Sequence, residues 1–149
     1  MGFGPTSIIG GKLARPELPA ICVSGDGGFL MVCQEVITAV EWGLPVVWVV
    51  FNNQTLGAIR GGQQASYGGR VIGTEFCEST DFAALAKALK AEGVVVNCYA
   101  EIADAMHFAQ ECGKPCVVDM RIARDPVPPP VAGMWHEPGR DEIPPKPRE

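Results

Sequence analysis

Two short polar motifs, each placed directly after a run of apolar residues, constrain this chain more than any other feature. The first motif is Gly25-Asp26-Gly27-Gly28, and the second is the pair Asn52-Asn53. Residues 20–24 (AICVS) precede the first motif, and residues 45–51 (PVVWVVF) precede the second. The second run is β-branched and shows no polar alternation, which is typical of a strand buried on both faces of a parallel sheet. We therefore expect two parallel strands, each with a polar motif at its carboxyl end.

The segment between the two strands is long enough to cross from one to the other. Residues 29–42 predict a helix of about four turns, and Gly43 and Pro45 would end it. The result is a β-α-β unit, in which both strands end at the same edge of the sheet. Ligands of open α/β sheets bind at that edge. Asp26 and Asn53 should therefore lie close together there.

The chemistry of these residue types indicates a metal-assisted phosphate site. Glycines such as Gly27 and Gly28 let the backbone approach an anion, but the carboxylate of Asp26 would repel a phosphate unless a cation lay between them. Mg²⁺ takes oxygen ligands from carboxylates, carbonyls and phosphates, and Asp26, the Asn53 amide and the Thr55 carbonyl could supply three. The amino end of the helix would face the same anion. The sequence thus predicts a divalent-metal clamp for a diphosphate.

Other readings of these glycines are weaker. A dinucleotide-binding fingerprint needs a third glycine where Leu30 stands, and a P-loop needs Ser or Thr after Gly11-Lys12, where Leu13 is found. Ordinary turns remain an alternative, since Gly-Asp-Gly and Asn-Asn are both common turn sequences. Their combination across one β-α-β unit favours the metal site.

The two motifs resemble the cofactor-binding module of thiamine diphosphate enzymes, of the acetolactate synthase and benzoylformate decarboxylase type. The likeness rests on GDGGF at residues 25–29, NNQTLGAIR at 52–60, MGFG at 1–4 and DFAALAKA at 81–88, and it extends to about residue 122. The chain departs from the family pattern after MGFG, where Pro5-Thr6-Ser7-Ile8 replaces Leu-Pro-Ala-Ala.

This resemblance implies a role for each matching residue. The ligands of Mg²⁺ would be Asp26, Asn53 and the carbonyl of Thr55. The diphosphate of thiamine diphosphate would lie on the glycine turn, with the backbone of Leu56 and Gly57 over it and Met1 supporting its bent conformation. The full implied set of cofactor-binding residues is Met1, Gly25, Asp26, Gly27, Gly28, Asn53, Thr55, Leu56 and Gly57.

The resemblance also implies an activity and a missing part. The family decarboxylates 2-keto acids, often with carboligation, and acetolactate synthase-like chemistry is the first expectation. A 2-keto-acid decarboxylase or a sulfoacetaldehyde acetyltransferase-like subunit is the alternative, and a non-catalytic cofactor-binding or regulatory protein is the alternative of another class. The glutamate that activates the cofactor comes from a pyrimidine-binding domain, which we do not find here. No catalytic residue is therefore assigned, and we expect a partner domain or subunit in a homo- or hetero-oligomer, with the chain either a split subunit or a fragment.

Composition excludes several other classes. The chain has 149 residues, 47% of them hydrophobic and 19% charged, which fits one globular domain. Its net charge of −5 without a basic cluster argues against nucleic acid as a partner, and no apolar run is long enough for a membrane span. The six cysteines form no C-x-x-C pair, so we expect reduced thiols in a cytoplasmic protein. His107, without a metal-spaced partner, should be a surface or edge residue, and the family resemblance implies a structural or interface role for Glu35.

The rest of the chain alternates between helices and strands. Helices are expected at residues 8–14, 81–91 and 101–112, and strands at 94–99 and 115–122. This order predicts an α/β fold, a doubly wound parallel sheet with helices on both faces, in a single domain of residues 1–124. Residues 125–149 contain eight of the thirteen prolines and predict an extended tail.

One segment of the predicted domain is rich in glycine. Residues 54–74 include five glycines between Gly57 and Gly69, which predicts a loop with one helical turn at residues 56–60. Because it follows the metal motif directly, it could act as a lid, with an ordinary surface linker as the alternative. Arg60 within it could meet an acidic substrate or a phosphate.

Overall fold

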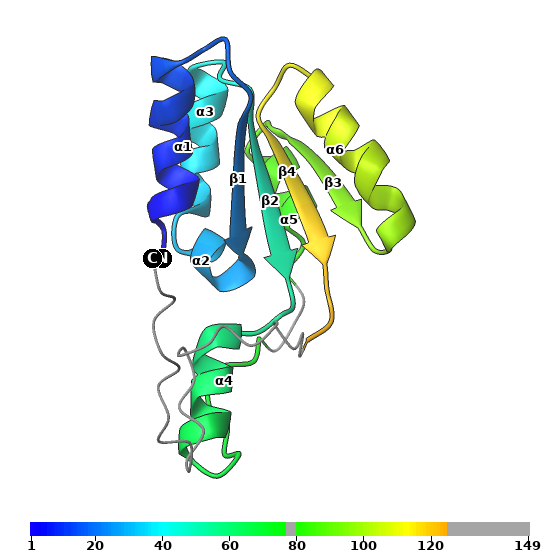
Figure 1. The fold of residues 1–149 in the computed structure, drawn as a ribbon. Helices are drawn as coiled ribbons and strands as arrows, with labels where there is room; N and C mark the ends of the chain where they lie inside the picture. The colour runs from blue at the N-terminus through cyan, green and yellow to red at the C-terminus, as the bar shows by residue number, and fades with distance from the viewer. Residues whose placement is uncertain (77–79, 125–149) are drawn as a thin grey trace, which may run out of the picture.

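A four-stranded parallel sheet forms the centre of the molecule. The structure is a computed structural model and describes residues 1–76 and 80–124. The strands are β1 (Ala20–Gly25), β2 (Val46–Asn52), β3 (Glu92–Val96) and β4 (Cys116–Arg121), in the spatial order β1-β2-β4-β3. All neighbouring pairs are parallel, with Ser24 opposite Val50 and Val50 opposite Asp119. The carboxyl ends of the strands therefore share one edge of the sheet (Figure 1).

Helices α1 (Phe3–Ala14), α2 (Asp26–Leu30), α3 (Val36–Glu41) and α5 (Phe82–Ala88) contribute to one core against the sheet. At its centre, Phe29 contacts Trp48 and Phe82, with ring centroids 6.3 and 5.6 Å apart. The Trp48 indole is buried, and its Nε1 donates to the Pro5 carbonyl at 2.9 Å. One side chain of β2 thus anchors α1 to the sheet.

On the opposite face, the described residues form one helix, α6 (Ile102–Glu111), which packs on β3 and β4. Val49 and Val118 are buried on this face. Ile21 and Val23 of the edge strand β1 lie opposite Val47 and Val49, yet remain 39% and 60% exposed. The layer of helices on this face is therefore incomplete over β1 within the described residues.

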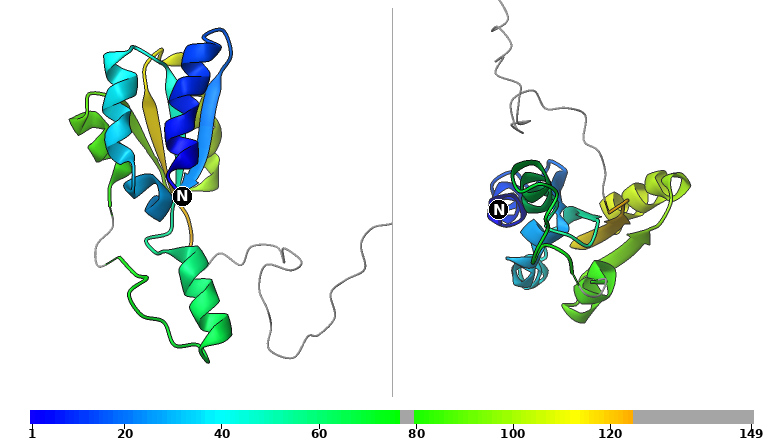
Figure 2. Two further views of the ribbon diagram at one scale, coloured as in Figure 1. Left: turned by 90° about the vertical axis from the view of Figure 1, so that its left-hand side faces the viewer. Right: turned by 90° about the horizontal axis from the view of Figure 1, so that it is seen from below.

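The predicted doubly wound parallel sheet with helices on both faces is confirmed (Figures 1 and 2). Gly93 in β3 shows why α5 can lie so close to the sheet. A Cβ at this position would overlap the backbone of Ala83, so any larger residue would push α5 away.

The prediction of a loop over residues 54–74 is wrong. The segment contains a ten-residue helix, α4 (Gly57–Ser66), which projects beyond the carboxyl edge of the sheet (Figures 1 and 2). None of its residues is buried. Its glycines gave the sequence a low helix propensity, and the helix is held by pairing of the chain on either side of it, described below.

The prediction of one continuous helix over residues 29–42 is also wrong. Two short helices, α2 and α3, flank the 3₁₀ turn η1 (Cys33–Glu35). Val32 leaves the helical region, with φ −142° and ψ 17°, and its side chain lies against Gly2. The break therefore lies where this segment contacts the start of the chain.

Other element boundaries differ from the predictions by a few residues. α1 begins at Phe3 and not at residue 8, and a second 3₁₀ turn, η2 (Tyr99–Glu101), precedes α6. β3 ends at Val96, which leaves Cys98 exposed outside the strand. The expected tail at residues 125–149 and Cys77 lie outside the described residues. In the described ranges, no helix has the length and apolar character needed to cross a membrane.

Candidate functional site

A cavity of about 330 Å³ lies at the carboxyl edge of the sheet. Its walls come from the first residues of the chain, the end of β1, the start of α2 and the segment that leads into α4. Eight of the nine residues implied to bind the cofactor line it, namely Met1, Gly25, Asp26, Gly27, Gly28, Thr55, Leu56 and Gly57. Segments distant in the sequence thus meet around one space.

Asp26 joins the ends of the two strands. Its side chain is almost fully buried, at 3% exposure. Oδ1 accepts a hydrogen bond from the Gly27 amide at 2.6 Å, and Oδ2 accepts from the amides of Asn53 and Gln54 at 3.1 and 2.7 Å. Each carboxylate oxygen can accept more than one bond, so these contacts orient Asp26 without exhausting its capacity for a cation.

Asn53 meets Asp26 through its backbone. Its side-chain Nδ2 donates to the Arg124 carbonyl at 3.1 Å, which engages the amide nitrogen and not the amide oxygen. Asn53 is not among the residues that line the cavity. The structure therefore brings Asn53 next to Asp26, as the β-α-β argument predicts, while its role as a metal ligand stays a prediction.

Thr55 is buried at the cavity wall. Its hydroxyl donates to the Thr74 carbonyl at 2.8 Å, and its own carbonyl accepts from the Gly57 amide at 2.8 Å. A second lone pair of that carbonyl remains for a cation. The oxygen types of Asp26, Asn53 and Thr55 match the ligands that Mg²⁺ takes. Within the described part of the chain, no three His, Cys, Asp or Glu side chains cluster in a way that could hold a metal.

The glycine turn leaves room for a ligand. A Cβ at Gly25 would meet no atom within 4 Å, and Gly25 lines the cavity, so a side chain there would fill the cavity itself. A Cβ at Gly27 would overlap the Leu56 side chain, which shows that Leu56 packs directly on the turn. Because α2 has only five residues, its dipole contributes less to anion binding than the expected four-turn helix would.

Residues 54–56 and 74–76 pair with each other and form a two-stranded neck that carries α4 away from the sheet. The Leu56 amide donates to the Thr74 carbonyl at 2.8 Å, and the Phe76 amide donates to the Gln54 carbonyl at 3.1 Å. Between these bonds, Thr55 and Glu75 form an antiparallel bridge. Leu56 and Gly57 therefore line the cavity from a segment whose position is fixed by its own return strand.

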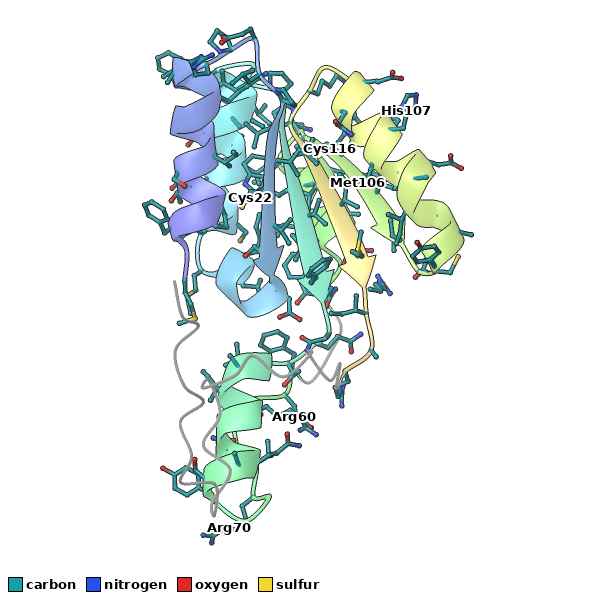
Figure 3. All side chains as sticks on the ribbon, in the orientation of Figure 1. Cys22, Arg60, Arg70, Met106, His107 and Cys116 are labelled. Carbon is teal, nitrogen blue, oxygen red and sulfur yellow. The ribbon has the colours of Figure 1, made fainter. Side chains whose placement is uncertain are left out.

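Charged residues brace the same neck. Arg60 of α4 forms an ion pair with Glu75, and Arg124 Nη1 lies 4.0 Å from the other oxygen of Glu75. Arg60 is labelled with Arg70 on the projecting part of the molecule in Figure 3. The expected contact of Arg60 with an acidic substrate or a phosphate stays a prediction. Its ion pair with Glu75 also gives Arg60 a structural role, since it links α4 to the neck.

His107, Glu35 and the described cysteines have contacts that are typical of structural residues. His107 is exposed, and its Nε2 lies 3.0 Å from Glu111 one turn later (Figure 3), which confirms the surface prediction. Glu35 accepts a hydrogen bond from the Thr38 hydroxyl at 3.0 Å. The cysteines that the structure describes are all free thiols.

Sequence reasoning missed a second buried carboxylate, Asp119 in β4, which is 0% exposed. Burial raises the pKa of Asp119, while hydrogen bonds from the Asn52 side chain and the Phe82 amide act in the opposite direction. The signal was present in the sequence, because an aspartate interrupts an apolar run (PCVVDMRI) predicted to be a buried strand. A charge at such a position calls for partners in the core.

A parallel α/β sheet with an acidic glycine turn at its carboxyl edge defines a phosphate- and cofactor-binding domain. Residues 1–120 match the family model described as "Thiamine pyrophosphate enzyme, C-terminal TPP binding domain". The chain therefore belongs to the thiamine pyrophosphate (thiamine diphosphate) enzymes through this domain.

Individual relatives agree with the family model. The chain is 39% identical over 122 residues to a probable acetolactate synthase large subunit of Methanococcus aeolicus, covering 82% of this chain and 20% of the relative. It is 38% identical over 128 residues to the sulfoacetaldehyde acetyltransferase of Alcaligenes xylosoxydans xylosoxydans, covering 83% and 21%. The chain thus spans about a fifth of the length of these curated relatives.

A solved structure supports the same assignment. The thiamine diphosphate-dependent 4-hydroxybenzoylformate decarboxylase of Rhodococcus jostii RHA1 superposes with a TM-score of 0.78 at 28% identity, covering 84% of this chain and 24% of that one. The predicted family, fold and cofactor class are confirmed.

Proposed function

We propose that this chain holds the diphosphate and Mg²⁺ of thiamine diphosphate in an enzyme that acts on 2-keto acids by decarboxylation and carboligation, as acetolactate synthase does. The observation that carries the proposal is the buried carboxylate of Asp26, which is fixed at the cavity by the amides of Asn53 and Gln54. A carboxylate at the wall of this cavity needs a cation beside it to make the site attractive to an anion.

The residues around the cavity divide the work of holding the cofactor. Asp26, Asn53 and Thr55 would hold Mg²⁺ through a carboxylate, an amide and a backbone carbonyl, with phosphate oxygens and water completing the shell. The open space at Gly25 would admit the diphosphate, and Leu56 and Met1 would provide apolar walls. The Gly27 amide is occupied by Asp26, so its part is to orient the metal ligand.

When bound, thiamine diphosphate supplies a nucleophilic carbon and an electron sink for the keto acid. This chain's residues bind and orient the charged end of the cofactor. The carboxylate that activates the cofactor would come from a pyrimidine-binding domain or subunit.

Two exposed apolar surfaces support a missing neighbour. Met1 and Phe3 at the cavity are 87% and 80% exposed, and Ile21 and Val23 leave the edge strand β1 uncovered on one face. Exposed apolar groups that cluster at a cavity and a sheet edge mark interaction sites. We place the active form in a homo- or hetero-oligomer in the cytoplasm, which suits the free thiols of the described cysteines.

The relatives keep two further activities open. Similarity to sulfoacetaldehyde acetyltransferase and to 4-hydroxybenzoylformate decarboxylase supports an acetyltransferase-like or a simple decarboxylase subunit as alternatives. A non-catalytic cofactor-binding or regulatory protein is the alternative of another class, and the intact Asp26 site speaks against it.

A chimera separates a catalytic role from a non-catalytic one. The matched segment of the Methanococcus aeolicus relative is replaced by this chain, and release of CO₂ from pyruvate is measured with thiamine diphosphate and Mg²⁺. We expect turnover that is abolished by Asp26→Ala and retained in Asp104→Ala, an exposed carboxylate of α6. Binding of the cofactor without turnover would favour the non-catalytic alternative, and absence of Mg²⁺-dependent binding by the chain itself would overturn the proposal.

A further inference from the structure

Asp119 is a buried acidic residue whose two hydrogen-bond donors, Asn52 and Phe82, lie far apart in the sequence. Its Oδ1 accepts from Asn52 Nδ2 at 2.9 Å, and its Oδ2 accepts from the Phe82 amide at 3.2 Å. The guanidinium of Arg121 has its Nη2 3.8 Å from Oδ2. A buried carboxylate is costly unless hydrogen bonds compensate it, so the two donors are essential to its presence here.

The two donors stand at the two ends of one segment. Residues 53–81, which we call the excursion and of which the structure describes 53–76 and 80–81, follow Asn52, carry α4, and precede Phe82, the first residue of α5. Asn52 Nδ2 also donates to the carbonyl of Thr80 at 3.0 Å. The Asp119 carboxylate and the Asn52 side-chain amide therefore hold the two ends of the excursion together inside the core.

The base of the excursion lies next to the metal-binding motif. Asn53 and Gln54, whose amides orient Asp26, follow Asn52 directly. The Asn52 carbonyl accepts from the Ile122 amide at 3.0 Å, so β4 holds Asn52 through backbone and side chain together. A shift of Asn52 would move both amides that reach Asp26.

We infer that Asp119 is a positioning residue, which fixes where β2 ends and where the chain returns at α5, and thereby sets the geometry of the metal site without touching the metal or the cofactor. The inference rests on the proposed function, since it concerns the same site. It differs from a purely structural role in one respect. Loss of the Asp119 carboxylate should weaken Mg²⁺ binding by more than its effect on stability explains.

Asp119→Asn tests this directly. The side chain keeps its shape but offers one acceptor to two donors, so either Asn52 or Phe82 loses its partner. The matched control is Val118→Ala, a neighbouring buried residue of β4 that faces the opposite core. The thermal midpoint of each variant is measured first, and the Mg²⁺ concentration that half-saturates binding of thiamine diphosphate is then measured by calorimetry at a temperature where both are folded.

We expect Asp119→Asn to raise the half-saturating Mg²⁺ concentration about 10-fold, as is usual for residues that orient metal ligands, and Val118→Ala to leave it within about 2-fold. Equal shifts in both variants, or no shift in Asp119→Asn, would overturn the inference. If Asp119→Asn does not fold, Asn52→Ala carries the same test, and wild-type Mg²⁺ affinity in that variant would refute it. Failure of the unmodified chain to bind the cofactor would instead count against the proposed function.

Discussion

The sheet and the excursion of residues 53–81 are built on different principles. In β2, five consecutive residues from Val46 to Val50 are buried, and the strand is covered on both faces. In α4, no residue is buried, and glycines at positions 57, 61 and 62 lower its helix propensity. The sheet is thus stabilised by its own apolar sequence, whereas α4 depends on the neck below it.

The largest expected contrast is in stability. Trp48→Ala removes a fully buried ring of the larger core and its hydrogen bond to the Pro5 carbonyl, and should lower the free energy of unfolding by about 3–5 kcal/mol. Tyr67→Ala, which removes a 61% exposed ring at the end of α4, should change it by less than about 0.5 kcal/mol. Urea unfolding of both variants measures the difference. Comparable losses would show that α4 is part of the same cooperative core.

A second contrast concerns local opening. Short helices without buried residues open readily, so the amides of α4 should exchange with solvent far faster than those of β2. Thiamine diphosphate with Mg²⁺ should slow exchange in α4 by at least about 10-fold, equivalent to about 1.4 kcal/mol, and leave β2 unchanged. Hydrogen exchange followed by mass spectrometry provides the measurement, with Asp26→Asn as the control that should show no slowing. Equal protection of α4 and β2 in the free chain would contradict the comparison.

The smallest expected effect is a pH dependence of the free energy of unfolding, caused by one buried thiol of the sheet. Burial raises the pKa of the Cys116 thiol in β4 from 9.0 to about 12. The unfolded chain therefore loses this proton first, and the stability that the buried neutral thiol contributes is complete below pH 9 and lost as the pH rises towards 12. Between pH 9 and pH 10 the loss should be about 1 kcal/mol.

The control for this effect is Cys116→Ala. Its stability should be lower at pH 8 because packing is lost, but it should decline less steeply between pH 9 and 10. Urea unfolding at each pH measures the stability of both proteins. Parallel declines would mean that other groups cause the alkaline loss of stability.

The sequence alone was enough to predict the parts of this domain that depend on local pattern. The strands at β1 and β2, the turn at Asp26 and its proximity to Asn53 follow from apolar runs and from the geometry of one β-α-β unit. The helix α4 was missed because its glycines predict a loop. Its position depends on pairing between Leu56 and Thr74, which are distant in the sequence. Asp119 was missed because its partners, Asn52 and Phe82, come together only in three dimensions.

The central claim is that Asp26 lets a cation join this chain to a diphosphate. Isothermal calorimetry of the chain with thiamine diphosphate, with Mg²⁺ or with EDTA, tests it most directly, because the carboxylate proposed to hold the cation belongs to this chain. We predict binding that requires Mg²⁺ and for which inorganic pyrophosphate competes. Affinity should weaken about 100-fold in Asp26→Ala, while Asp104→Ala binds normally. Binding that survives EDTA, or that is unchanged in Asp26→Ala, would contradict the account.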